Sequence, residues 1–206
     1  MKKLIFILLA LSISNITVNA RNAEGEASSR LTFGLEWGYI AAFHTGFHYY
    51  YFAPEGFRVD EFGNSFIFRS NVEGYAHIGY NLSDKWNIAL YAGYTGIAGM
   101  HKAIPVSIRG TRYFGNDPSM DRWLAFIDLG TGVCIKNPIQ EILSAKAGGG
   151  YRLALSRDTS LDFIFSVRTV YTHPHVYYDG MEIPSDKINR NNAVANSLSI
   201  GMALSF

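Results

Sequence analysis

The chain has 206 residues, enough for one domain, and its formal net charge is only +1 at pH 7. This balance gives no reason to expect nucleic acid as a partner. The one cysteine, Cys134, excludes an internal disulfide, and no segment after the first twenty residues has the length of uninterrupted apolar residues that a membrane-spanning helix needs.

The first twenty residues are expected to be a secretory signal peptide. Lys2 and Lys3 precede a short apolar run, and the small residue Ala20 ends the segment before a polar stretch. No cysteine stands near this cleavage site, so a lipid anchor is not expected. Residues 21–30 are polar and are interpreted as a short lead-in, which leaves residues 31–206 as the folded domain.

Apolar and small or polar residues alternate in eight later segments, which predicts an all-β fold. In the last segment the large apolar residues end on the C-terminal aromatic Phe206, while serine, glycine and alanine occupy the positions between them. The predicted strands are, in chain order, about 31–39, 66–80, 86–97, 104–114, 123–135, 143–156, 161–171 and 197–206.

Charged residues fall on the face that the bulky apolar residues leave free. A soluble barrel of the lipocalin kind would need an apolar lumen, whereas a membrane barrel turns its apolar residues toward lipid. The predicted lumen has four acidic and five basic residues, namely Glu36, Arg69, Glu73, Arg109, Asp128, Lys146, Arg152, Asp162 and Arg168. The pattern therefore predicts an eight-stranded antiparallel up-and-down transmembrane β-barrel.

The connections between the strands alternate in length. Short turns are expected at 81–85, 115–121 and 156–160, and mostly longer loops at 40–65, 98–103, 136–142 and 172–192. Short periplasmic turns and longer outer loops are typical of outer-membrane barrels. With an even number of strands, both chain ends then lie in the periplasm.

With its signal peptide, its eight alternating strands and the final Leu204-Ser205-Phe206, the chain resembles small bacterial outer-membrane β-barrels of the OmpA/OmpX-like, porin-family type. The resemblance implies a location in the bacterial outer membrane, in contact with outer-membrane lipids and lipopolysaccharide. It also implies that Phe206 belongs to a signal that the barrel assembly machinery reads.

The lumen charges allow two interpretations. An eight-stranded barrel is only wide enough for its side chains to fill it, so charges of mixed sign are expected to pair as a structural polar core. The alternative is a path for a solute or a proton, with Arg69, Glu73 and His77 as its members.

The expected outer loops contain histidines and many aromatic residues. Five histidines lie in or beside them, but without cysteine or a HExxH motif they predict no metal site. The aromatic residues of loop 40–65 fit an interfacial girdle, or else a ligand-binding surface. An extracellular ligand is accordingly possible at loops 40–65 and 172–192.

Three functions follow, in order of preference. The first is a non-enzymatic barrel with a structural or surface-interaction role, with no catalytic residue and no cofactor. The second is a narrow conduit for small solutes. The third is a lipid A-modifying enzyme, although the chain has no His-x-Ser pair on one strand face like that of the lipid A deacylases.

Overall fold

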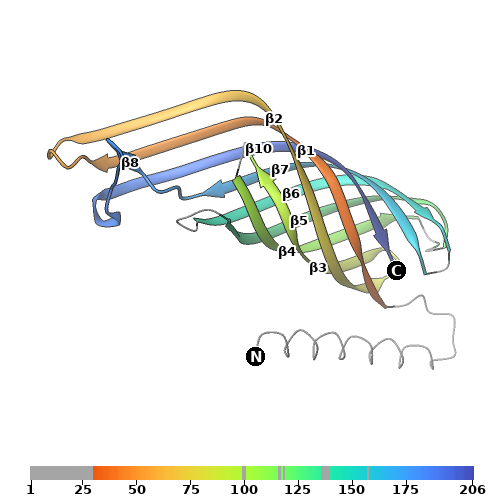
Figure 1. The fold of residues 1–206 in the computed structure, drawn as a ribbon. Helices are drawn as coiled ribbons and strands as arrows, with labels where there is room; N and C mark the ends of the chain where they lie inside the picture. Colours follow the sequence, from red (N-terminus) through yellow and green to blue (C-terminus); the bar gives the residue numbers. More distant parts are fainter. Residues whose placement is uncertain (1–29, 99–100, 116, 118, 136–139, 157) are drawn as a thin grey trace.

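The computed structural model describes residues 30–98, 101–115, 117, 119–135, 140–156 and 158–206. Eight antiparallel strands close into one barrel (Figure 1). They are β1 (Leu31–Phe52), β2 (Arg58–Ser83), β3 (Trp86–Ile97), β4 (His101–Phe114), β5 (Arg122–Cys134), β6 (Gln140–Ala154), β7 (Ser160–Thr172) and β10 (Ile188–Ser205). The expected signal peptide, and the lead-in apart from Arg30, lie outside the described residues.

Each strand pairs with its neighbours in the chain, and β1 closes the ring by pairing with β10. The expected up-and-down order of eight strands is therefore confirmed. Closure leaves no open sheet edge within the barrel wall, which is the condition for placing strands in lipid. Among the described residues, no helix combines the length and the apolar character needed to cross a membrane.

The two faces of the barrel wall differ as the alternation predicts. Large apolar side chains such as Leu35, Leu129 and Phe165 are exposed on the outer face. Charged side chains such as Glu36 and Arg109 are buried on the inner face. An apolar outer surface around a polar interior is the arrangement of a transmembrane β-barrel.

The strand bounds agree with the predicted ones at β3 and differ most from them at β1 and β2. The segment 40–65, expected to be a loop, continues both strands and turns only between Phe52 and Arg58. In this turn Gly56 has a φ of 90°, which favours glycine, and its N–H donates to the carbonyl of Ala53 at 2.9 Å. The physical reason for the longer strands is the aromatic run from Phe47 to Phe52, which has high β propensity.

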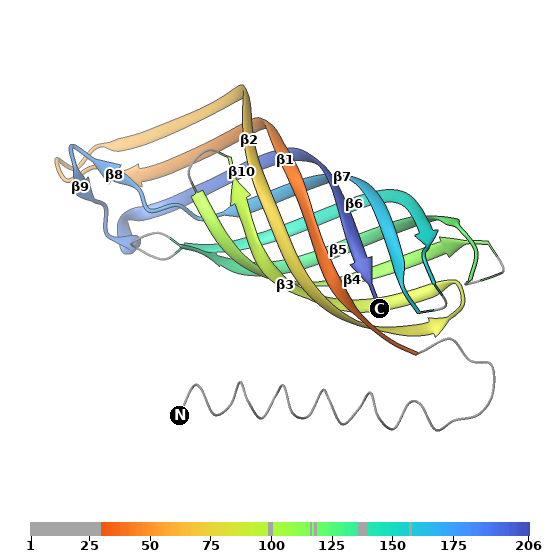
Figure 2. The same ribbon diagram turned by 45° about the vertical axis from the view of Figure 1, so that its right-hand side comes forward.

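The outer parts of β1, β2 and β10 extend past the other strands. β3 pairs with β2 only from Glu73 onward, and β7 pairs with β10 only up to Ala193. Residues 44–52, 58–72 and 188–192 form a three-stranded sheet that reaches past the last β2–β3 and β7–β10 pairs, and we call it the projecting sheet (Figures 1 and 2).

A β-bulge marks the base of the projecting sheet. Ala42 pairs with Ser197 and His44 pairs with the adjacent Asn196, so β1 has one extra residue, Phe43, at this point. The extra residue reverses the alternation of β1. His44 therefore lies on the outer face, where the side-chain amide of Asn196 donates to its Nδ1 at 3.0 Å.

The segment expected as a polar loop at 172–192 is partly ordered into a small hairpin. Its strands are β8 (Tyr177–Tyr178) and β9 (Met181–Glu182), followed by a 3₁₀ turn at Ser185–Lys187. The hairpin turns at Asp179 and Gly180, which both have positive φ values, as the tightest hairpin turns require. The segment packs on the inner face of the projecting sheet in an apolar cluster of Tyr51, Val176 and Ile183, flanked by Tyr49, Val59, Tyr178 and Ile188.

Candidate functional site

Arg109 lies at the centre of the lumen and contacts two acidic residues. Its Nη1 and Nη2 donate to the carboxylate of Glu36 at 2.5 and 3.2 Å, while its Nε and Nη2 donate to Asp128 at 3.1 and 3.0 Å. The rings of Tyr91 and Phe126 lie 3.9 and 4.2 Å from the guanidinium carbon. Paired charge and aromatic contacts together satisfy a side chain that is almost fully buried.

Lys146 connects this group to a third acidic residue, Glu73. Its Nζ lies 2.9 Å from Glu36 and 2.9 Å from Glu73. Glu73 also accepts a hydrogen bond of 3.3 Å from the Tyr75 hydroxyl and lies 3.7 Å from Arg168. Lys146, Glu36, Glu73 and Arg168 thus join β6, β1, β2 and β7 across the lumen.

Arg168 forms the outer part of the network. Its guanidinium donates to the carbonyl of Gly96 at 2.7 Å, to the Ser197 hydroxyl at 3.3 Å and to the Thr95 hydroxyl. Ser197 stands on β10, the neighbour of β7 in the ring, whereas Thr95 and Gly96 stand on β3, which lies on the opposite side of the ring. Arg168 therefore spans the lumen at this height.

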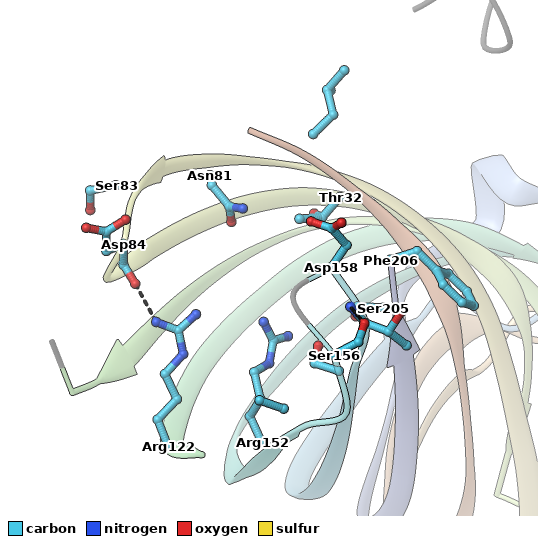
Figure 3. A pocket seen from close by; sticks show the side chains of 14 residues that line it. Thr32, Asn81, Ser83, Asp84, Arg122, Arg152, Ser156, Asp158, Ser205 and Phe206 are labelled. Atoms are coloured by element: carbon cyan, nitrogen blue, oxygen red, sulfur yellow. Dashed lines mark hydrogen bonds between the residues drawn. The ribbon is translucent and has the colours of Figure 1, made fainter. Parts of the chain in front are cut away.

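A separate ion pair lies toward the end of the lumen that has the short turns. The Nε and Nη2 of Arg152 each donate to Asp162 at 2.7 Å. Arg122 donates to the backbone carbonyl of Asp84 at 2.6 Å, and both guanidinium groups lie over the ring of Tyr113. Figure 3 shows Arg122 and Arg152 side by side at a pocket of about 70 Å³ between the periplasmic turns.

His77 is buried but stands outside the ion pairs. Its ring stacks on Tyr91 with centroids 4.8 Å apart, and its Nε2 lies 3.5 Å from the Ser205 hydroxyl. Its Nδ1 has no hydrogen-bond partner among the described residues. The adjoining cavity measures about 20 Å³, which is room for about one water molecule.

An apolar layer covers the network at the outer end of the lumen. It consists of inward-facing residues from five successive strands, namely Ile97, Ala103, Cys134, Ile142 and Val170. All five are buried. A hydrated ion moving along the lumen would have to cross this layer and also separate the charge pairs below it, and both steps are costly.

Nine of the ten residues expected in the lumen lie there, and Arg69 does not. The alternation of β2 gives Arg69 the inward parity, but the residue lies past the last β2–β3 pair at Glu73 and is exposed. Its expected place in the network is wrong because the barrel wall ends below it. Without Arg69, the predicted set has four acidic and four basic side chains, and the buried Arg122, which the sequence interpretation omitted, is a fifth basic side chain in the described lumen.

The terminal aromatic closes the barrel at the periplasmic end. Phe206 and Phe33 exchange two backbone hydrogen bonds, of 2.8 and 3.1 Å, between β10 and β1. The Phe206 side chain is exposed on the outer side of the wall. Its role in assembly stays a prediction.

The outer histidines take part in separate polar contacts. His48 lies between Asp60, 2.8 Å from its Nε2, and Arg190, whose Nη1 is 3.1 Å from its Nδ1. His173 contacts Asn191, and His175 contacts Glu182. Within the part of the chain that the structure describes, no three histidine, cysteine or acidic side chains are grouped to hold a metal ion.

Two features of the site lie beyond the sequence interpretation. Thr95 and the Gly96 carbonyl were not among the predicted lumen groups, although the position of Thr95 two residues before Ile97 on an alternating strand could have indicated it. The projecting sheet is the larger omission. Its signal was the continued run of strand-forming residues after Tyr39.

Three solved structures resemble the chain at low sequence identity. Neisserial surface protein A is 13% identical with a TM-score of 0.49, and the match covers 88% of this chain and all of that one. The outer membrane protein OprG of Pseudomonas aeruginosa is 11% identical with a TM-score of 0.48, covering 85% and 95%. The N-terminal β-barrel domain of OprF from the same organism is 16% identical with a TM-score of 0.43, covering 84% and 99%.

No family model matches the chain, and a search of curated proteins finds no match either. The class of the protein therefore follows from its own geometry. Eight antiparallel strands close with an apolar outer face, a polar lumen, short turns at one end and long extensions at the other. This is the architecture of bacterial outer-membrane barrels, and the chain is a small β-barrel of that type.

Proposed function

We propose that this protein is a non-conducting outer-membrane barrel that holds the projecting sheet outside the membrane for contacts at the cell surface. Residues 1–20 serve as its export signal, and Phe206 contributes to recognition by the barrel assembly machinery. The outer face of the wall contacts outer-membrane lipid and lipopolysaccharide. No catalytic or cofactor role is part of the proposal.

The filled lumen supports the scaffold role. Four acidic and four basic side chains pair within it, and the apolar layer lies above them. The alternative role, as a conduit, would need a continuous water path through both. The same contacts tie opposite sides of the barrel together, which suits a rigid support.

The observation that carries the proposal is the projecting sheet itself. Residues 58–72 of β2 extend past the rim, a length of about 50 Å at ~3.3 Å per residue. The segment around β8 and β9 packs against the inner face of this sheet. The ring of strands closes below this extension, so closing the barrel wall does not require it.

Thiol labelling of intact cells tests where the projecting sheet lies. Phe62→Cys is placed on the projecting sheet in a Cys134→Ala background and treated with a membrane-impermeant maleimide. Phe62 is 75% exposed, so we expect labelling without permeabilisation. Thr159→Cys, in a periplasmic turn, is the matched control and should be labelled only after the outer membrane is permeabilised. Labelling of Thr159→Cys alone on intact cells would overturn the proposal.

A further inference from the structure

One edge of the projecting sheet is open. Residues 58–72 of β2 pair with β1 and with no other described strand, because β3 joins β2 only at Glu73 (Figures 1 and 2). The opposite edge, on β10, is covered: the side-chain amide of Asn191 donates to the carbonyl of Pro174 at 3.2 Å, and His173 contacts Asn191. The apolar hairpin cluster covers the inner face. Among the strands that the structure describes, the β2 edge is the part of the projecting sheet left without a partner.

This open edge has few of the devices that prevent strand pairing. Native edge strands are short, covered, interrupted by proline or heavily charged. The β2 edge is long and contains no proline, and Phe62, Phe66 and Phe68 on it are 75%, 83% and 76% exposed. Of its four exposed charges, Asp60 pairs with His48, whereas Arg58, Glu61 and Arg69 form no ion pair among the described residues. The edge is therefore suited to pairing with another strand.

We propose that the β2 edge pairs antiparallel with the same edge of a second copy of this chain, with Ser65 opposite Ser65. This inference rests on the proposed surface role. In this register Glu61 of each copy lies opposite Arg69 of the other, and Phe62 lies opposite Phe68. Both members of each pair lie on the same face of the joined sheet, as cross-strand pairing requires. A shift of two residues in either direction removes both ion pairs, so charge complementarity selects this register.

The direction of pairing determines where the second copy lies. β2 runs from the outer tip toward the periplasmic end, and an antiparallel partner runs the opposite way. The two barrels consequently point in opposite directions, which places them in two membranes that face each other. The pairing is therefore a contact between cells, and many copies on each surface would strengthen it through avidity.

Vesicle tethering tests the charge pairs. Proteoliposomes with wild-type protein and two fluorescent dyes are expected to form mixed clusters, whereas empty liposomes are not. Glu61→Arg or Arg69→Glu places like charges opposite each other at both pairs, and we expect tethering to fall at least tenfold. Mixing Glu61→Arg vesicles with Arg69→Glu vesicles should restore tethering, because the charges again oppose. A heat-modifiable gel shift confirms that each variant is folded.

Disulfide formation tests the register. In a Cys134→Ala background, Ser65→Cys places two thiols opposite each other at the symmetry centre, and oxidation should give a covalent dimer between vesicles. Ser70→Cys, on the same edge, lies opposite Asp60 and should give none. Equal cross-linking of the two variants, or no restoration by the mixed charge variants, would overturn the proposal. If wild-type vesicles fail to tether while Phe62→Cys is labelled on cells, pairing between copies is wrong and the surface role stands.

Discussion

At the scale of single residues, Arg109 shows how the lumen side chains join strands that are not neighbours in the ring. It contacts Glu36 across the lumen and Asp128 on the adjacent strand, between two aromatic rings. The alternation of the strands places these charges inside. It does not indicate which of them pair, because Lys146 and Glu36 are 110 residues apart in the chain. Pairing depends on the order of the strands around the ring and on their stagger. Neither can be predicted from the residue pattern of a single strand.

Removing Arg109 should destabilise the barrel strongly. Arg109→Ala leaves Asp128 without its partner and Glu36 with Lys146 alone, and breaking a buried pair in this way costs about 3–5 kcal/mol. Urea unfolding in lipid vesicles measures the loss. Arg69→Ala is the matched control, since Arg69 is exposed outside the network, and its effect should stay within about 0.5 kcal/mol. Equal losses for the two variants would contradict the assignment of Arg109 to a paired core.

At the scale of elements, the sequence predicts which strands exist better than it predicts where they end. β3 has its expected bounds because turn residues precede it and the chain turns soon after it. β1 and β2 continue past the rim, and the sequence does not show where they leave the membrane because a strand alternates in the same way inside and outside it. The bulge at Phe43 also reverses the faces of β1, so no single alternation runs from Leu31 to Phe52.

The outer face of β7 gives a test of the lipid-facing assignment. Phe165 is 52% exposed in the middle of this strand, and an arginine at mid-depth of a bilayer costs about 2–4 kcal/mol. Phe165→Arg should lower the free energy of unfolding by that amount. Phe62→Arg replaces an equally apolar residue outside the membrane and should leave the barrel stability nearly unchanged. A tolerated Phe165→Arg would show that β7 does not face lipid there.

The last strand gives a test of assembly. Phe206 pairs with Phe33 through the backbone and carries the terminal aromatic ring. We expect Phe206→Asp to reduce the amount of folded barrel in the outer membrane severalfold, because it removes the terminal aromatic ring. Phe206→Tyr should keep the wild-type amount, because it retains that ring. Heat-modifiable protein in membrane fractions is the readout. Wild-type amounts of Phe206→Asp would mean that the terminal aromatic is incidental.

At the scale of the whole molecule, the barrel consists of a periplasmic ion pair, a central charge network, an apolar layer and the projecting sheet, in that order. The first three layers close the lumen, and the fourth extends beyond the rim. A closed lumen below a long outer sheet favours a support for surface contacts over a route for solutes.

Single-channel recording of the purified wild-type barrel in a planar lipid bilayer tests this account most directly. The paired lumen and the apolar layer predict that insertion gives no resolvable current steps at moderate voltage and in concentrated salt. Phe62→Cys labelled with a bulky maleimide, a change outside the barrel, should leave the recording equally silent. Reproducible conductance steps from folded wild-type protein would contradict the closed-lumen account and favour the conduit.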